Sequence, residues 1–159
     1  MIFYDQLALM REDSVELRDC IEKTITELNR QKTTVNKPGI LLGKIQSGKT
    51  RAFLGVIGLA FDKGYGIAVI LTKGTKSLAK QTIKRVREDF KTFIKSDDVQ
   101  VFDIMSLPDN LTPYELNQKL ILVVKKEDDN LRRLLKAFNT QYPVLKEKRL
   151  LKRPVLSPF

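Results

Sequence analysis

The sequence contains no histidine and only one cysteine, Cys20, among its 159 residues. The lack of histidine excludes Ser-His-Asp and Cys-His nucleophile systems, imidazole general bases and zinc sites that need imidazole. A single cysteine can form neither an internal disulfide nor a four-thiolate metal site, which suits a reducing compartment. Several common hydrolytic and metal-dependent chemistries are thus ruled out before any motif is considered.

Long apolar runs are also missing. No stretch approaches the roughly 18 residues of a membrane span, and the first residues do not resemble a secretory signal. Hydrophobic residues make up 42% of the chain and charged residues 30%, a composition typical of a folded domain and not of a disordered chain. We therefore expect a cytoplasmic protein without a membrane partner, and its length suits one compact domain.

Apolar patterns of two kinds alternate along the chain. Apolar positions spaced by three and four predict helices around residues 14–30, 49–64, 79–93 and 128–138. Short apolar runs predict buried strands at residues 39–43, 66–71, 99–102 and 120–124. This alternation predicts an α/β fold in which a mainly parallel sheet is flanked by helices. We divide the chain into an N-terminal helical segment (1–37), a partial nucleotide-binding domain (38–151) and a tail (152–159).

Some helix boundaries can be named. Asp13 or Ser14 is expected to cap the first helix, and Gly64 occupies the position of a C-cap glycine for the second. In the last helix the residues expected on the core side are Leu131, Leu134, Leu135 and Phe138.

The strongest chemical signal is Gly43-Lys-Ile-Gln-Ser-Gly48-Lys49-Thr50, which satisfies the phosphate-loop pattern G-x-x-x-x-G-K-[ST] in full. Glycine permits backbone angles at which successive N–H groups surround an anion, and the N-terminus of the following helix adds a positive dipole end. We expect Lys49 to contact the β- and γ-phosphates as the catalytic cation and the Thr50 hydroxyl to bind Mg²⁺. A chance match is expected in roughly one chain of this length in a hundred or fewer.

Gln46-Ser47-Gly48-Lys49-Thr50 resembles motif I of superfamily 2 helicases and translocases. The segment Gly74-Thr75-Lys76-Ser77-Leu78-Ala79-Lys80-Gln81 is similar to the family motif P-T-x-x-L-A-x-Q, with glycine in place of proline. A third segment, from Ile121 to Leu134, resembles helicase-like ATPases associated with bacterial and phage endonucleases. The resemblance spans roughly residues 38 to 135.

This resemblance implies a RecA-like P-loop NTPase that binds ATP and Mg²⁺ and acts on DNA or RNA within a longer motor or an endonuclease complex. It places ATP at Gly43, Gln46, Ser47, Gly48, Lys49, Thr50 and Arg51. It places the nucleic-acid backbone near Thr75, Lys76 and Gln81.

The sequence departs from that family at its catalytic acids. Residues 144–151 resemble the approach to the strand that carries the family's Asp-Glu pair, but Lys152-Arg153-Pro154 follows. The second RecA-like domain, which supplies an arginine finger, is also missing. We therefore interpret the chain as the front portion of a motor that stops before the Walker B motif, a helicase-type hydrolase by resemblance only, with little or no hydrolysis alone.

Two other functions stay open at this stage. If Asp103, at the end of a predicted strand, binds Mg²⁺, the chain could be a small P-loop phosphotransferase; a strand-end aspartate is more often a turn former. The simplest interpretation of Asp97 and Asp98 is a solvated turn. That of the acidic run Glu127, Asp128 and Asp129 is the first turn of a helix. Alternatively, the chain is a nucleic-acid-binding fragment with a vestigial phosphate loop.

The chain is strongly basic, with 29 Lys and Arg against 19 Asp and Glu and a net charge of +10. Part of this charge lies on one face of the helix predicted from residue 79, opposite its apolar face. The basic residues of this face are Lys80, Lys84, Arg85, Arg87 and Lys91. They either follow the phosphates of a nucleic acid or form an ordinary solvated surface, and the sequence supports the two interpretations equally.

Overall fold

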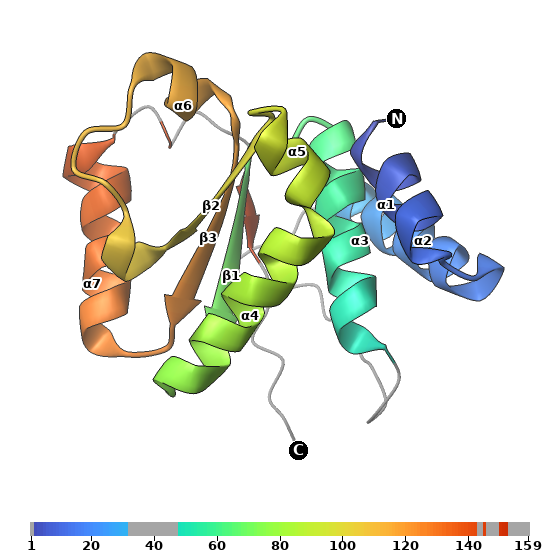
Figure 1. Cartoon of the computed structure of the whole chain (residues 1–159), viewed down its shortest axis with the longest axis horizontal. Coiled ribbons are helices and arrows are strands. Elements are labelled where there is room, and N and C mark those ends of the chain that lie inside the picture. The colour runs from blue at the N-terminus through green and yellow to red at the C-terminus, as the bar shows by residue number, and fades with distance from the viewer. Residues whose placement is uncertain (1, 32–47, 143–144, 146–149, 153–159) are drawn as a thin grey trace. The chain divides into compact units, whose positions relative to one another are not determined.

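The computed structural model describes residues 2–31, 48–142, 145 and 150–152 (Figure 1). These residues belong to two compact units, Met1–Lys63 and Gly64–Phe159. The strand predicted at residues 39–43, the boundary predicted at residues 37 and 38, and the tail beyond residue 152 lie outside the described residues.

The described part of the first unit is helical. It consists of α1 (Phe3–Arg11), α2 (Val15–Arg30) and α3 (Lys49–Asp62). The Ser14 hydroxyl accepts a hydrogen bond from the Leu17 N–H at 3.3 Å, so Ser14 and not Asp13 caps α2. Gly64 follows α3 with φ +88°, as a C-cap glycine does, and confirms that prediction. Helix α1 was not predicted.

Helix α3 is the buried centre of this unit. Every residue from Leu54 to Phe61 is buried, and both α1 and α2 pack against α3. Glycine permits this close approach: a Cβ on Gly55 would lie 2.4 Å from Ile21 Cδ1, and one on Gly58 would lie 2.6 Å from Leu7 Cδ1. The carboxylate of Asp62 accepts the backbone N–H groups at the start of α1, so the ends of the two helices are joined.

The second unit is built on a parallel four-stranded sheet of order β2-β3-β1-β4. The strands are β1 (Ile67–Thr72), β2 (Val99–Asp103), β3 (Lys119–Lys125) and the short β4 (Leu150–Lys152). Ile67 of β1 is in register with Leu120 of β3 and Leu150 of β4. The predicted α/β class and the parallel arrangement of strands are confirmed.

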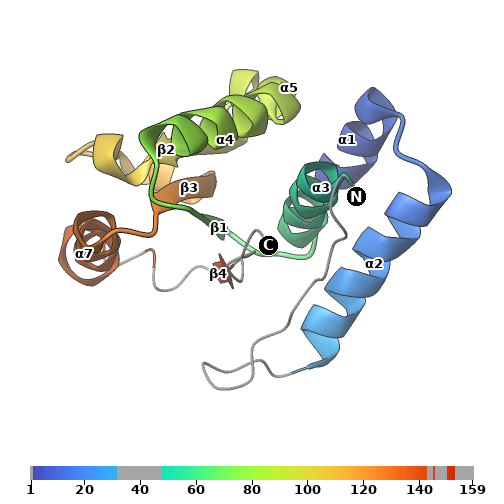
Figure 2. The ribbon, with the colours of Figure 1, turned by 90° about the horizontal axis from the view of Figure 1, so that it is seen from below.

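Helices cover both faces of this sheet (Figure 2). On one side lie α4 (Lys76–Asp89) and α5 (Lys91–Lys95); on the other lies α7 (Asp128–Lys136), which continues into a π-helical turn, Ala137–Gln141. The connection from β2 to β3 contains a 3₁₀ turn (η1, Ile104–Ser106) and the short α6 (Pro113–Asn117). Helix α6 was not predicted, and the helix predicted across residues 79–93 is divided at Phe90.

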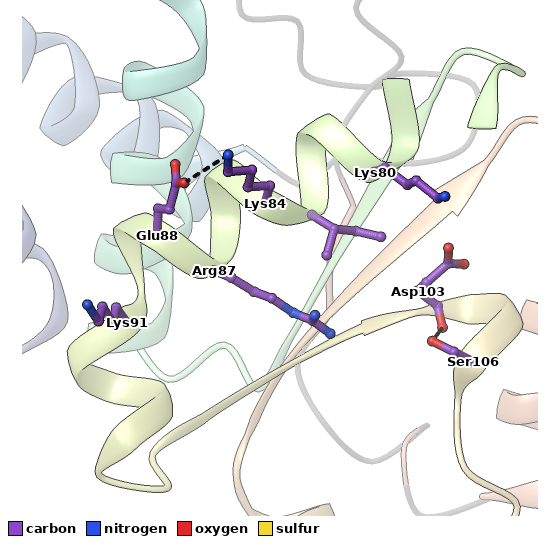
Figure 3. A pocket seen from close by; sticks show the side chains of 8 residues that line it. Lys80, Lys84, Arg87, Glu88, Lys91, Asp103 and Ser106 are labelled. Atoms are coloured by element: carbon purple, nitrogen blue, oxygen red, sulfur yellow. Dashed lines mark hydrogen bonds and ion pairs between the residues drawn. The ribbon is translucent and has the colours of Figure 1, made fainter. Parts of the chain in front are cut away.

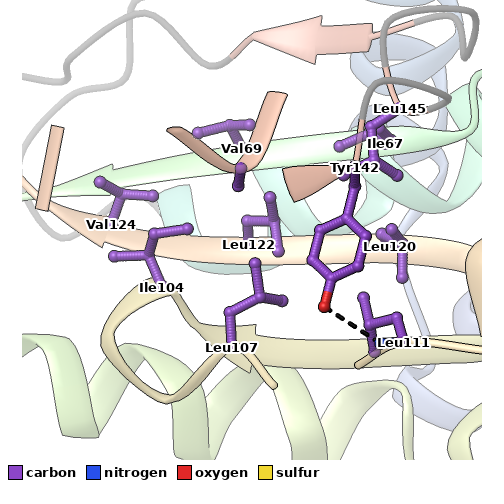
Figure 4. Packing of buried hydrophobic residues seen from close by; sticks show 11 residues of the cluster. Ile67, Val69, Ile104, Leu107, Leu111, Leu120, Leu122, Val124, Tyr142 and Leu145 are labelled. Carbon is purple, nitrogen blue, oxygen red and sulfur yellow. Dashed lines mark hydrogen bonds between the residues drawn. The ribbon is translucent and has the colours of Figure 1, made fainter. Parts of the chain in front are cut away.

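The main core of this unit lies on the α7 side of the sheet (Figure 4). Alternate residues of β1 and β3, including Ile67, Val69 and Leu122, pack there against Ile104 and Leu107. The Tyr142 hydroxyl accepts a hydrogen bond from the Leu111 N–H at 3.0 Å and so holds the β2–β3 connection over the core. Many of these side chains are less than 2% exposed, so truncating one leaves a cavity.

One prediction about the core, that Leu135 faces it, is wrong. Leu131, Leu134 and Phe138 pack against the core as expected, but the Leu135 side chain is 61% exposed. Among the described helices, none is long and apolar enough to cross a membrane.

Candidate functional site

The described end of the phosphate-loop motif, Gly48-Lys49-Thr50, lies at the N-terminus of α3. Gly43, Gln46 and Ser47 fall outside the described residues, whereas Gly48, Lys49 and Thr50 are described. Gly48 is the N-cap residue with φ +66° and ψ 24°, a left-handed conformation that costs an L-residue roughly 1–2 kcal/mol. Its carbonyl accepts the Ala52 N–H at 3.1 Å, so the helix begins where the motif requires.

The N-terminus of α3 has the electrostatics of an anion site. Among the described residues no side chain caps it, and its first turn contains no acidic residue. The first N–H groups of a helix and its dipole together favour a negative charge at this end. An ideal Cβ on Gly48 would meet nothing within 4 Å, so the described residues leave the space beside it open. Lys49 and Thr50, the next two residues, are both half-buried.

Arg51, the last residue of the predicted ATP contacts, makes a contact that the sequence did not indicate. Its guanidinium donates to Asp13 Oδ1 at 3.0 Å and to the Arg11 carbonyl. The Asp13 side chain is fully buried and also accepts from Arg11 Nη2 at 2.5 Å. Asp13 therefore links the first turn of α3 to the connection between α1 and α2, and Arg51 has a structural role there.

The residues that the resemblance places near nucleic acid lie at the start of α4. Thr75 is the N-cap, and its Oγ1 accepts a hydrogen bond from the Leu78 N–H at 3.4 Å. Lys76 and Gln81 are exposed. The structure thus gives Thr75 a capping role and leaves the side chains of Lys76 and Gln81 accessible.

A basic groove runs along the side of α4 (Figure 3). Its volume is about 600 Å³, and one wall is formed by Lys80, Lys84, Arg87 and Lys91, four of the five residues of the predicted basic face. The opposite wall is the end of β2 and the turn after it, with Asp103 and Ser106. The fifth predicted residue, Arg85, does not line the groove.

The charged groups of this groove differ in how firmly they are held. Arg87 Nη2 donates to the Val101 carbonyl at 3.1 Å, which fixes the guanidinium over β2. Lys84 Nζ lies 3.9 Å from Glu88 Oε1, and both side chains are well exposed, so this pair contributes little stability. Lys80 and Lys91 form no ion pair with any described residue.

The carboxylates considered for other chemistry have structural roles. Asp103 Oδ1 accepts the Met105 N–H at 3.0 Å, so Asp103 ends β2 and caps the turn that follows. Asp97 is exposed at φ 59°, and Asp128 and Asp129 lie in the first turn of α7. Within the described parts of the chain, no cluster of three or more His, Cys, Asp or Glu could hold a metal. Neither the hydrogen bond of Asp103 nor the described carboxylates favour Asp103 as a metal ligand.

Comparison of the chain with models of known protein families, with curated proteins and with solved structures gives no match. Two features of the described residues bear on function: the Gly48-Lys49-Thr50 end of the phosphate-loop motif at the start of α3, and the basic groove beside α4.

Proposed function

We propose that the chain is a P-loop module that binds ATP together with Mg²⁺ at the N-terminus of α3. The observation that carries the proposal is Gly48 in a left-handed conformation directly before Lys49 and Thr50, which begin a 14-residue helix. In the sequence, the five residues before Gly48 complete the phosphate-loop motif. Both the motif and the helix start that it requires are therefore present.

Each residue has a defined task in this proposal. The Lys49 ammonium neutralises charge on the β- and γ-phosphates, and the Thr50 hydroxyl is a Mg²⁺ ligand. The backbone N–H groups at the start of α3 bind phosphate oxygens. The buried body of α3 and the contact between Arg51 and Asp13 hold this helix end in position, which lowers the cost of ordering it when the nucleotide binds.

We further propose that this module belongs to a superfamily 2-like helicase or translocase. The motif I resemblance and the motif that begins near Thr75 support this assignment, and a parallel sheet flanked by helices is compatible with a RecA-like domain. Because the family's Asp-Glu pair is not in the sequence, little transition-state stabilisation is available. We therefore expect binding with little or no hydrolysis.

A nucleotide titration tests the proposal. Binding of a fluorescent ATP analogue is measured by anisotropy with and without Mg²⁺, for the full chain and for Lys49→Ala. We expect Lys49→Ala to weaken binding at least tenfold, and Thr50→Ala to remove most of the effect of Mg²⁺. Lys23→Ala removes the same charge from the exposed side of α2 and should leave affinity unchanged.

Two results would contradict this function. If Lys49→Ala and Lys23→Ala bind the analogue as tightly as the original chain, the phosphate loop is vestigial. If phosphate release from ATP proceeds at a rate typical of motors and depends on Lys49, the expectation of little hydrolysis is wrong.

A further inference from the structure

A large share of the chain's net positive charge lies on α4 and α5. The 20 residues from Lys76 to Lys95 contain seven basic and two acidic side chains, a net charge of +5, which is half of the +10 carried by all 159 residues. Four of the seven basic residues line the groove beside α4. Basic side chains outnumber acidic ones here by seven to two, whereas the two signs are mixed on a surface without a large field of one sign.

Three of the four cations in the groove lie along one side of α4. Lys80, Lys84 and Arg87 follow the spacing i, i+4 and i+7 within this helix, and Lys91 is the first residue of α5. From Lys80 to Arg87 the helix rises about 10 Å at ~1.5 Å per residue. A row of this length can contact successive phosphates of one strand.

We propose that this groove binds the sugar-phosphate backbone of a nucleic-acid strand. The occupant is a linear polyanion and not a single phosphate group, because the cations are spread along α4 and into the start of α5 on an open surface. Lys80 and Lys91 have no ion pair among the described residues, and Lys84 has only its exposed contact with Glu88. These three ammonium groups can therefore bind phosphates without breaking a strong internal contact.

The groove lacks the features of sequence readout. None of its lining residues is aromatic, so bases have no side chain on which to stack. Asp103, on the opposite wall, has its Oδ1 engaged with the Met105 N–H. We therefore expect binding that depends on the backbone, is steeply sensitive to salt and shows little preference for base sequence.

This inference extends the nucleic-acid part of the proposed function and rests on it for the class of polyanion. It assigns a surface other than the one that the resemblance implies. Thr75, Lys76 and Gln81 do not line the groove, which extends along α4 from Lys80 and past its end to Lys91.

The test measures binding of a labelled 20-nucleotide single strand to the full chain by fluorescence anisotropy between 50 and 200 mM salt. Three phosphate contacts predict a slope of about −2 in log K against log salt, or a loss of affinity of roughly twentyfold over that range. The variant Lys80→Ala/Lys84→Ala/Lys91→Ala should bind at least tenfold more weakly at 50 mM salt and lose most of the slope.

A matched control removes the same number of charges elsewhere. Lys23, Lys126 and Lys136 are exposed and do not line the groove, so the triple alanine variant at these positions should lose less than threefold. Circular dichroism and thermal melting establish that both variants are folded. Equal losses in the two variants, or no loss in the groove variant, would overturn the proposal.

Two further arms separate strand binding in the groove from nucleotide binding at the phosphate loop and from membrane binding. Lys49→Ala should leave strand binding intact, and the groove variant should still bind the ATP analogue, so failure of one site does not mimic failure of the other. Vesicles containing an anionic phospholipid are added as competitor at equal phosphate concentration. If they displace the strand completely and bind in a groove-dependent manner, the surface binds membranes and the proposal is wrong.

Discussion

Helices α3 and α4 each have 14 residues, but they use those residues in opposite ways. Helix α3 is buried continuously from Leu54 to Phe61 and has only three charged residues, at its two ends. Helix α4 has two buried residues, Ala79 and Val86, and seven charged ones. A helix buried along its body can offer a ligand only its end, whereas a helix exposed along its side can offer a row of side chains.

In the two proposals, each helix binds a different kind of anion. The end of α3 presents converging N–H groups and Lys49, which suit a compact triphosphate. The side of α4 presents Lys80, Lys84 and Arg87 along the groove, which suits an extended strand. The predictions that follow test whether α3 depends on its packing and α4 on its surface.

The largest effect is expected from truncating the body of α3. Leu54 is 1% exposed, and Leu54→Ala should lower the free energy of unfolding by about 2–5 kcal/mol because it leaves a cavity. Lys84→Ala on α4 should change it by less than about 0.5 kcal/mol, since it alters only an exposed side chain. Urea unfolding measures both values, and similar losses in the two variants would remove the contrast between the helices.

A smaller effect is expected at the N-cap of α3. Gly48→Ala places an L-residue at φ +66° and should cost about 1–2 kcal/mol through backbone strain alone, because no described atom would contact the new Cβ. Gly48→Asn should cost less, since asparagine tolerates the left-handed region. Thermal melting and nucleotide titration check this order. If alanine and asparagine are equally harmless, the left-handed cap does not constrain the loop.

Tyr4 tests how α1 covers the buried side of α3. Its ring is buried, and its hydroxyl has no hydrogen-bond partner among the described residues. Tyr4→Phe removes that unsatisfied group and should stabilise the chain by about 1 kcal/mol. Tyr114→Phe changes an exposed ring and should have no measurable effect.

The buried Tyr4 hydroxyl should also make stability depend on pH in the alkaline range. Burial, followed by the nearby charge of Asp13, raises the pKa of Tyr4 above its ordinary value of ~10. The folded chain therefore retains the Tyr4 proton at a pH where the unfolded chain loses it, and stability falls as the pH rises above ~10. Urea unfolding at pH 8 and at pH 10.5 should show a smaller alkaline loss in Tyr4→Phe. An equal loss in both proteins would assign the effect to other groups.

The sequence predicted those parts of the structure that depend on local pattern. The apolar runs of β1 and β3, the Ser14 cap and the start of α3 at Lys49 are all encoded by neighbouring residues. Helix α1 was missed because it exposes Leu9 and Met10 beside its buried residues and so has no clean apolar stripe.

The missed features of the two candidate sites depend on contacts between distant residues. Asp13 and Arg51 are 38 positions apart, and only the packing of α1 and α2 on α3 brings them together. The basic stripe of α4 was visible in the sequence, but the opposite wall of its groove, at Asp103 and Ser106, comes from the next strand. Periodicity identifies one face of a helix but not what lies beside it.

The smallest effect concerns Thr75, for which the resemblance and the structure suggest different roles. As the N-cap of α4 it accepts the Leu78 N–H at a long 3.4 Å, so Thr75→Ala should cost only about 0.5–1 kcal/mol, and Thr75→Ser should cost less. If Thr75 only caps the helix, both variants bind the labelled strand with unchanged affinity. If it also contacts phosphate, Thr75→Ala weakens binding while Thr75→Ser retains it, because serine keeps the hydroxyl. Measuring stability and affinity on both variants separates the two roles, since loss of a helix cap lowers only stability whereas loss of a phosphate contact also lowers affinity.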